Sequence, residues 1–261
     1  LTFTASPVQT KKFSWKTNFN ISYNKNMLVS LSDENYDHSY LVINIPSGAR
    51  IGFNEVPIFK IEEDQPLGNI FGYEFAGFSE EGKWQIWDET GIEKKLASTG
   101  SFDDKKIIGN GLPKSYLGFI NNFIYGNFDL TVALRGAIGF EIMNLHSMAR
   151  ENLNRLPQNI LYRAISDPEI SKIRDSKNYE TSYHVEPGDF VKLDNLTLGY
   201  TIPIKAVKQF RIYGSAKNLF CLTQYTGEDP EQQITGLMPG YDNIWNYPKV
   251  KTFSFGLNVN F

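Results

Sequence analysis

Cysteine is almost missing from this chain, and so is any long apolar run. Cys221 is the single cysteine among 261 residues, so an internal disulfide is excluded and a cysteine-based metal site is not indicated. The net charge of −3 gives no general polyanion-binding surface, which argues against a nucleic-acid partner. No stretch approaches 18 consecutive apolar residues, so the sequence predicts no transmembrane helix.

Aromatic residues, by contrast, are plentiful: the chain has 19 Phe, 14 Tyr and 4 Trp. The mean hydropathy of −0.34 is nevertheless that of a water-soluble protein. A membrane β-barrel has the same average, because lipid-facing and lumen-facing residues alternate along each strand. Average hydropathy therefore does not separate these two classes, and the alternation itself must be read strand by strand.

The clearest alternation lies at residues 253–261, where every odd position is apolar or aromatic and every even one is small or polar. This pattern predicts a strand with one apolar face and one polar face. Its polar-x-Gly-x-x-apolar-x-aromatic ending (Ser254, Gly256, Val259, Phe261) is similar to the membrane-assembly signal of outer-membrane barrel proteins. An ordinary half-buried strand is the alternative for this segment alone.

Five further strands are predicted by the same period of two, at 13–23, 117–125, 128–140, 191–200 and 210–219. The dipeptide Gly126-Asn127 predicts a two-residue hairpin turn with positive φ. The phase of the alternation slips at Asp194-Asn195, which predicts a β-bulge. Residues 1–5 also alternate and lead into a brief connection expected at 6–9.

Short and long connections alternate between these strands. Those at 6–9, at 126–127 and around Pro203 are short, whereas 24–112, 141–188 and 221–248 are long. Outer-membrane barrels have short periplasmic turns and long external loops. The pattern therefore predicts an all-β, antiparallel transmembrane segment with a periplasmic C-terminus. About six strands would leave two open edges in lipid, so we expect a larger partner segment to complete the barrel.

No catalytic residue, metal site or cofactor is predicted, and the chain is not expected to be an enzyme. The three histidines are expected to be exposed loop residues without metal-ligand spacing. Aromatic and polar residues in the long loops are candidates for ligand binding, because aromatic faces beside amides and carboxylates can hold sugars (Trp84, Trp87, Tyr241, Asp242 and Trp245). The alternative is that they pack loop against loop or form an interfacial aromatic girdle, for which Phe13, Trp15 and Tyr125 are better placed. Apolar spacing over 141–175 predicts an amphipathic helix.

An ordered set of short motifs resembles a known family. It comprises Gly68-Asn69-Ile70-Phe71-Gly72-Tyr73, Ile108-Gly109-Asn110-Gly111-Leu112-Pro113, Asn127-Phe128-Asp129-Leu130, the run from Gly188 to Tyr200, Arg211-Ile212-Tyr213, Lys217-Asn218-Leu219-Phe220, Tyr225-Thr226-Gly227, Asp229-Pro230-Glu231 and Tyr247-Pro248-Lys249. In this order they resemble the C-terminal barrel end of SusC-like (SusC/RagA) TonB-dependent transporters of Bacteroidetes outer membranes.

The resemblance implies a 22-stranded barrel with an N-terminal plug and a TonB box, capped by a SusD-like surface lipoprotein. Residues 1–261 would be the C-terminal part of that barrel, with the plug and the TonB box absent from this chain. The implied function is TonB-dependent import of oligosaccharides or peptides through the outer membrane. The implied partners are the lipoprotein, TonB through the plug, the remainder of the transporter, outer-membrane lipid and the substrate.

Two alternatives remain on sequence grounds. The first is a non-transporting outer-membrane barrel or adhesin. The second is a soluble carbohydrate-binding β-sandwich, in which the apolar faces of two sheets would pack on each other.

Overall fold

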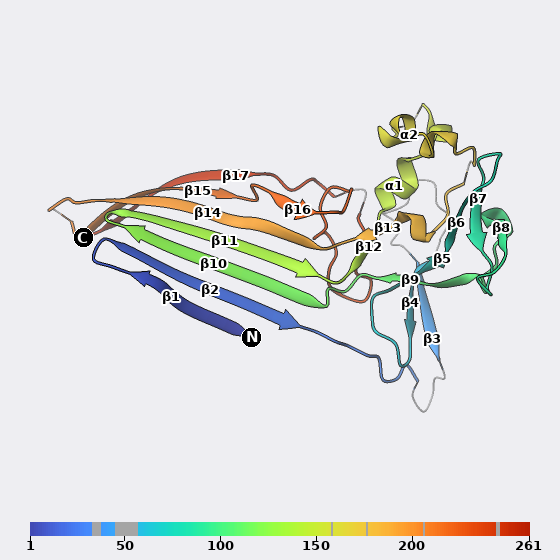
Figure 1. The fold of residues 1–261 in the computed structure, drawn as a ribbon, viewed down its shortest axis with the longest axis horizontal. Coiled ribbons are helices and arrows are strands. Elements are labelled where there is room, and N and C mark those ends of the chain that lie inside the picture. Colours follow the sequence, from blue (N-terminus) through green and yellow to red (C-terminus); the bar gives the residue numbers. More distant parts are fainter. Residues whose placement is uncertain (33–37, 45–56, 158, 176, 206, 244–245) are drawn as a thin grey trace.

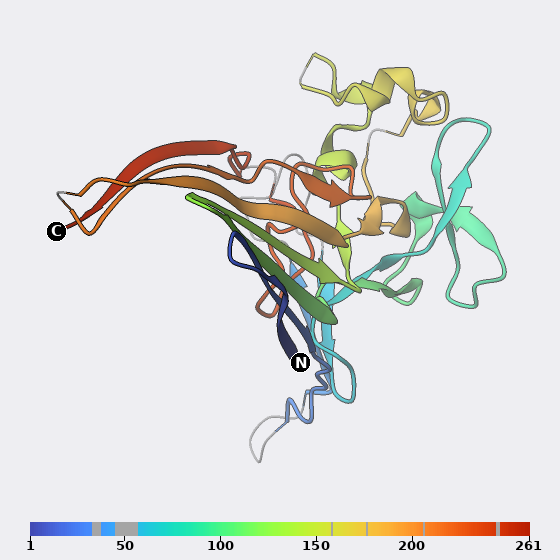
Figure 2. The same ribbon diagram turned by 60° about the vertical axis from the view of Figure 1, so that its left-hand side comes forward.

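The structure is a computed structural model that describes residues 1–32, 38–44, 57–157, 159–175, 177–205, 207–243 and 246–261. Its largest element is an eight-stranded antiparallel sheet, called here the wall sheet, which is long and curved (Figures 1 and 2). Seven strands pair in the order β1-β2-β10-β11-β14-β15-β17, and β16 pairs with β14 beside β15. Their bounds are β1 (Thr2–Gln9), β2 (Phe13–Tyr23), β10 (Ser115–Tyr125), β11 (Phe128–Ile138), β14 (Phe190–Ile202), β15 (Gln209–Lys217), β16 (Cys221–Thr223) and β17 (Thr252–Asn260).

The predicted hairpin between β10 and β11 is present. Tyr125 pairs with Phe128, which leaves Gly126 and Asn127 as the two loop residues. Only Gly126 has a positive φ, of 58°, and a glycine at the first loop position is typical of a type II′ turn. This turn matches the twist of the flanking strands and fixes their register.

The predicted bulge is also present, because Asn195 pairs with Ala133 and Leu193 with Leu134, so that Asp194 is the extra residue. The connection expected at 6–9 is wrong. Those residues belong to β1, whose pairing with β2 shifts register between Ala5 and Val8, around a proline that has no N–H to donate.

The two ends of the wall sheet differ. The short turns and the C-terminus lie at one end, called here the turn end (left in Figure 1). The three long connections leave from the opposite end, the loop end, and span 24–114, 139–189 and 218–251. Their described residues beyond the wall sheet form a separate mass, called here the loop body.

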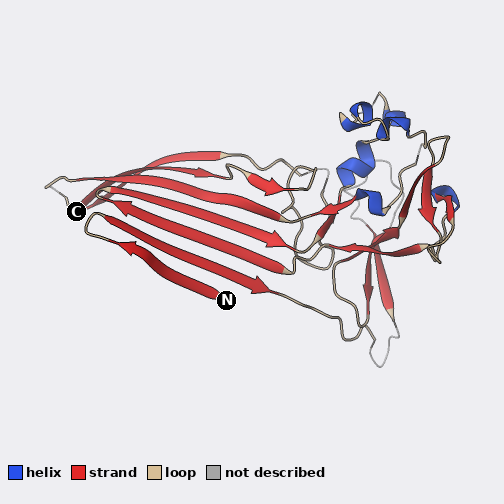
Figure 3. Cartoon of the chain, in the orientation of Figure 1, coloured by secondary structure: helices blue, strands red, loops and turns tan. Residues whose placement is uncertain are grey.

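The long connections are not irregular loops throughout, because the loop body contains sheets of its own. One contains β3 (Tyr40–Asn44), β4 (Pro57–Glu62), β5 (Asn69–Tyr73) and β9 (Lys105–Asn110), and another contains β6 (Phe75–Phe78), β7 (Trp84–Trp87) and β8 (Lys94–Leu96). A two-stranded sheet pairs β12 (Glu141–Met143) with β13 (Val185–Pro187). The helices are confined to this part (Figure 3): α1 (Leu145–Arg150), α2 (Arg163–Ser166) and the 3₁₀ turns η2 (Ala97–Thr99), η3 (Leu153–Arg155), η4 (Ile170–Lys172) and η5 (Ser182–His184).

The amphipathic helix expected over 141–175 is wrong. Only short helical segments form there, because Pro157 and Pro168 interrupt the helical backbone. The helix α1 begins where the Asn144 side chain accepts a hydrogen bond from the Ser147 N–H at 2.8 Å. Among the described helices, none is long and apolar enough to cross a membrane.

Apolar side chains of the loop body form two buried clusters. The first joins β4, β5, β12 and α1 (Ile58, Phe59, Ile70, Met143, Leu145, Met148, Tyr241), and the second centres on β7 (Tyr73, Trp84, Ile86, Ala97, Ala164, Ile170, Ile173). A third cluster lies where the loop body meets the loop end of the wall sheet (Ala137, Phe140, Ile142, Phe190, Tyr225). The loop body is therefore packed against the end of the wall sheet rather than attached only by chain crossings.

Candidate functional site

The two faces of the wall sheet have opposite chemistry. Cross-strand pairing aligns apolar residues in rows over neighbouring strands, of which one runs Trp15, Phe123, Leu130, Leu198, Gly214 and Phe255. Phe255 in that row is 91% exposed. A second row, nearer the turn end, is mainly aromatic (Phe13, Tyr125, Phe128, Tyr200, Ile212, Leu257). This face is apolar apart from the buried polar residues Thr17 and Asn121, of which Asn121 accepts a hydrogen bond from Trp15 Nε1.

The other face carries polar rows, such as Lys16, Asn122, Thr131, Thr197, Ser215 and Ser254. Arg211 on β15 reaches across β14 to Asp129 on β11, with Nε 2.8 Å and Nη2 2.5 Å from the carboxylate oxygens. Gly199 lies between them on β14, and a Cβ there would overlap both side chains. Glycine thus makes room for a bidentate ion pair over the sheet.

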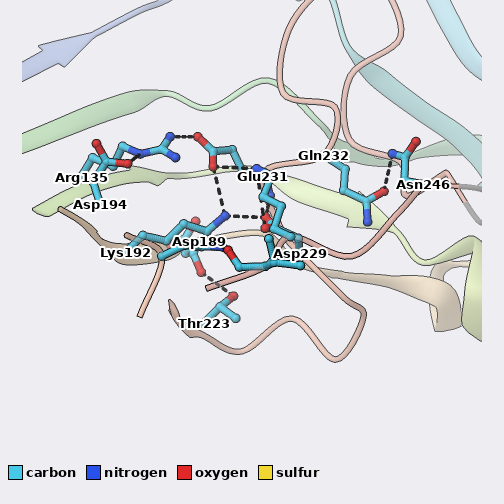
Figure 4. Close-up of polar contacts among 12 residues, drawn as sticks. Arg135, Asp189, Lys192, Asp194, Thr223, Asp229, Glu231, Gln232 and Asn246 are labelled. Carbon is cyan, nitrogen blue, oxygen red and sulfur yellow. Dashed lines mark hydrogen bonds and ion pairs between the residues drawn. The ribbon is translucent and has the colours of Figure 1, made fainter. Parts of the chain in front are cut away.

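A cluster of six charged residues lies where this polar face meets the loop body (Figure 4). Its centre is Lys192 on β14, whose side chain is 1% exposed. The Lys192 Nζ is 2.5 Å from Asp229 Oδ1 and 3.0 Å from Glu231 Oε2, and both acids come from the connection between β16 and β17. A buried lysine of this kind needs such partners, because an unpaired charge out of water is strongly unfavourable.

Two further cations and one further acid complete the cluster. Arg135 on β11 bonds Asp194 Oδ1 at 2.9 Å through Nε and bonds Glu231 through Nη1. Lys249 Nζ lies 3.0 Å from Glu231 and 3.6 Å from Asp229. Three cations face three carboxylates, so the cluster is electrically balanced. Its geometry fixes the connection between β16 and β17 over the polar face of the wall sheet.

A cavity of about 250 Å³ borders this cluster, lined by Asp229, Glu231, Gln232, Asn246, Tyr247 and Lys249. The Asn246 side chain donates to Gln232 Oε1 at 2.9 Å, and the Tyr247 ring is largely exposed beside them. Amide, carboxylate and ammonium groups next to an exposed aromatic ring can bind a polar organic molecule. They supply no nucleophile paired with a base, so the arrangement favours binding over catalysis.

No family model matches the chain. Over 97% of its length it is 28% identical to TonB-dependent receptor P3 of Formosa agariphila, and over 98% it is 27% identical to TonB-dependent receptor SusC of Bacteroides thetaiotaomicron. Its fold matches the solved RagAB peptide transporter with a TM-score of 0.79, at 20% identity and over the whole chain. A RagAB peptide importer in a "closed-closed" state matches with a TM-score of 0.76.

The resemblance to SusC-like TonB-dependent receptors is confirmed. The chain spans only 25% to 29% of the length of the curated relatives and solved structures it matches. The predicted fold class is confirmed as well, because the wall sheet is an antiparallel portion of a SusC-like barrel and not a closed barrel. The relatives are named as receptors and importers rather than as enzymes.

Within this SusC-like fold, the sequence-predicted ligand residues have different surroundings. Trp84 is 1% exposed and packs edge-on against Phe75, Phe78 and Tyr183. Burial in a part of a protein persists in the whole, so Trp84 has a packing role and offers no face for stacking. Trp87 is half-buried, with the Lys94 Nζ 5.1 Å from its ring centroid.

The other predicted ligand residues are also buried, where the structure describes them. Tyr241 packs against Phe59, and Asp242 is fully buried. Asp242 accepts a 2.5 Å hydrogen bond from the Tyr225 hydroxyl and another from the Leu145 N–H. Burial raises the pKa of Asp242 to about 7. Tyr241 and Asp242 therefore hold the loop body together, and Trp245 lies outside the described residues.

The residues of the predicted assembly signal lie on β17 or directly after it. Ser254 and Gly256 belong to the polar face, opposite Ser215 and Tyr213 of β15, while Val259 belongs to the apolar face. Phe261 follows the strand and is exposed. The residues alternate as the sequence pattern requires, and their role in membrane assembly stays a prediction.

The expectation of three exposed histidines is wrong for two of them. His146 and His184 are buried in the loop body, and only His38 is exposed. His184 Nδ1 lies 3.1 Å from the Ser147 hydroxyl, which also bonds Glu151 at 2.8 Å. Burial lowers the pKa of His184 to about 3, so its ring is neutral. Within the described residues no group of histidine, cysteine and acidic side chains could hold a metal ion.

The charged cluster was not predicted from the sequence. Two weak indications existed: Lys192 interrupts the apolar residues Val191 and Leu193 on the polar phase of its strand, and Asp229 and Glu231 stand two residues apart. Neither indicates which charge meets which, because the partners are 37 and 39 residues apart. Only the fold brings them together.

Proposed function

We propose that this chain forms part of the channel wall of an outer-membrane, TonB-dependent importer. The observation that carries the proposal is the apolar face of the wall sheet, which extends over strands β2 to β17 with large side chains exposed and contains the buried polar pair Thr17 and Asn121. A contiguous apolar surface of this extent is unfavourable in water and favourable against lipid chains. The polar face with its ion pairs then lines the lumen.

The topology supports an orientation. Short turns at the turn end are typical of the periplasmic side, and long connections at the loop end are typical of the outside. Phe13, Tyr125, Phe128 and Tyr200 form a row next to the short turns, which suits a girdle at the periplasmic interface. In this orientation the C-terminus is periplasmic and the loop body faces the medium.

The wall sheet needs further strands to function in a membrane. In the described structure β1 and β17 each have one paired and one open edge. Open edges are not tolerated in lipid, because their N–H and C=O groups find no water there. We propose that residues 1–261 are the C-terminal barrel part of a longer transporter that also supplies the plug and the contact to TonB. The greater length of the relatives supports this.

The loop body gives this importer its outer surface. We propose that it docks a SusD-like lipoprotein lid and that the substrates are oligosaccharides or peptides. The matching solved structures are of a peptide importer and a peptide transporter. Of the ligand-binding candidates from the sequence, Trp87 is not fully buried. The cavity beside Tyr247 lies close in sequence to the other candidates, so these two positions are proposed for ligand contact. A soluble β-sandwich is less favoured, because within the described residues no second sheet covers the apolar face (Figure 1).

The test is affinity purification from detergent-solubilised outer membranes, with the tag inserted in the turn between Gly91 and Ile92, where the chain is exposed. We expect to recover one longer polypeptide containing this chain, together with a surface lipoprotein, both identified by intact-mass and peptide mass spectrometry. Recovery with the membrane but without a lipoprotein would indicate a non-transporting barrel. Recovery from a detergent-free soluble fraction would refute the membrane proposal.

A further inference from the structure

A second cavity lies at the surface of the loop body, lined in part by residues 226–228, which directly precede Asp229 of the charged cluster. Its volume is about 380 Å³, which lies within the range of small-molecule sites. Three segments distant in sequence enclose it: α1 with the residue on either side, the turn before α2, and the chain after β16. The lining residues are Asn144, His146, Arg150, Glu151, Leu161, Tyr162, Arg163, Thr226, Gly227 and Glu228.

The charged residues of this cavity fall into two groups. Arg163 forms an ion pair with the buried Glu151 at 3.2 Å, so these two charges offset each other. The side chains of Arg150 and Glu228 have no hydrogen bond or ion pair within the described residues, although they line the same cavity. The cavity thus presents one unpaired cation and one unpaired anion.

His146 lies in the wall of the same cavity and is more than nine-tenths buried. Its Nε2 has no hydrogen-bond partner in the described structure. A buried ring nitrogen without a partner is unfavourable, but His146 Nε2 has almost no accessible surface and is not open to the cavity in this structure. Burial also lowers the pKa of His146, so the ring is neutral and Nε2 donates or accepts according to its tautomer.

The rim of the cavity is aromatic and apolar. Tyr162 is 80% exposed and Leu161 is half-buried next to it. Both residues precede α2, whose packing against the second cluster holds them in place through Ala164. An exposed ring beside a cavity gives an apolar part of a ligand a surface to cover.

We propose that this cavity binds a short peptide with free termini, its carboxylate on Arg150 and its ammonium group on Glu228. A guanidinium binds a carboxylate through charge-assisted hydrogen bonds, and a carboxylate binds an ammonium group in the same way. A side chain of the peptide covers Tyr162 and Leu161. Neutral oligosaccharides satisfy neither unpaired charge. The proposal rests on the import function above and names the substrate class for this site.

The experiment uses the complete transporter in detergent and measures binding by titration calorimetry. The probe is the tripeptide alanyl-leucyl-alanine in four forms: free, N-acetylated, C-amidated and blocked at both ends. We expect each block to weaken binding about ten-fold, which corresponds to the loss of one charge-assisted hydrogen bond. The dipeptide and tetrapeptide show which length spans the two charges.

Two variants assign each end. In Arg150→Gln, the free and C-amidated peptides should bind equally, while the effect of N-acetylation persists. In Glu228→Gln, the effect of N-acetylation should vanish and that of amidation persist. Matched controls are Arg174→Gln and Glu80→Gln, which line a different cavity and should leave all four affinities unchanged. A merely structural role for Arg150 or Glu228 would weaken every form alike, so it would not reproduce this selectivity.

The outcomes separate this site from the wider proposal. If the peptides bind but Arg150→Gln and Glu228→Gln behave as the controls do, the import function stands and this cavity is the wrong site. If cellotetraose binds instead, with loss in Tyr162→Ala and no effect of the two charge variants, the peptide assignment is overturned. If the protein is recovered only as a soluble chain, the import function itself fails.

Discussion

In the loop body, Trp84, Phe59 and Met143 are enclosed by residues of the same chain. In the wall sheet, Phe255, Leu198 and their row mates lie on an open face. The loop body is therefore built as a water-soluble protein is, around its own core. The apolar surface of the wall sheet, by contrast, is not covered by any other sheet of the described chain. Large apolar residues are thus buried in the loop body and exposed on the wall sheet. The arrangement of the strands determines which of these two environments each residue has.

This contrast also explains what is predictable from sequence. In the wall sheet, one apolar face and one polar face produce a sequence period of two that can be recognised along each strand, as in 253–261. The hairpin at Gly126 and the bulge at Asp194 are local features, and local residue chemistry predicts them. The loop body has no such period, because its short strands are covered on irregular sides by distant segments.

The largest expected effect concerns the core of the loop body. Trp84→Ala should lower the local stability of the β6-β7-β8 region by about 3–5 kcal/mol, because it removes a fully buried ring and leaves a cavity. Hydrogen exchange by mass spectrometry on the complete transporter would measure it. The wall sheet should keep its protection, and Trp87→Ala, at a half-buried position, should cost less. Equal loss of hydrogen-exchange protection in the loop body and the wall sheet of Trp84→Ala would contradict the view that the two regions have independent local stability.

The next effect tests the wall sheet through two adjacent residues. Leu198→Arg places a charge on the apolar face and should cost about 2–4 kcal/mol in lipid if Leu198 lies near the midplane, less toward an interface. Thr197→Arg places the same charge on the polar face and should be close to neutral. The measurement is heat-induced unfolding of the purified barrel on a gel. In a soluble sandwich Leu198→Arg would be damaging without any membrane, so recovery from outer membranes must be measured alongside.

A smaller effect tests the joint between the two regions. Lys192→Met removes the nearest cation of Asp229 and one of the three cations of Glu231, but Lys249 still faces both acids and Arg135 still pairs with Glu231. We therefore expect a loss of about 2 kcal/mol, below the range for a buried acid left with no partner. Hydrogen exchange of the connection between β16 and β17 should report it, with the wall strands unchanged. Lys249→Met, at a partly exposed position, is the matched control and should cost below about 1 kcal/mol.

The charged joint also marks where sequence reading stops. The residues of the charged joint come from β11 (Arg135), β14 (Lys192) and the connection between β16 and β17 (Glu231). The sequence around each one does not predict which residues it contacts. The buried histidines show the same limit, since His184 is enclosed by Trp84 and Tyr183 and only the latter is its neighbour in sequence. Residues whose surroundings come from far along the chain are the ones for which the expectation of exposure was wrong.

The effect that is smallest per pH unit is a pH dependence confined to the loop body. Burial raises the pKa of Asp242 to about 7, so the folded state holds a proton that the unfolded state releases near its ordinary value of about 4. The contribution of Asp242 to stability is therefore full below about pH 4 and is lost as the pH rises through about 7. Asp242→Asn has no charge to bury and should remove this dependence, which amounts to about 1.4 kcal/mol per pH unit at most.

His184 complicates that measurement and so fixes its design. Its pKa is lowered to about 3, so its contribution is full above about pH 6.5 and is lost as the pH falls toward 3, the opposite direction. The quantity to follow is the difference between wild type and Asp242→Asn in the opening free energy of the loop body, from which the His184 contribution cancels. This difference should favour the variant more at pH 7.5 than at pH 5, while the wall sheet shows no change. A difference independent of pH would mean that Asp242 stays charged in its buried position, stabilised by Tyr225 and the Leu145 N–H.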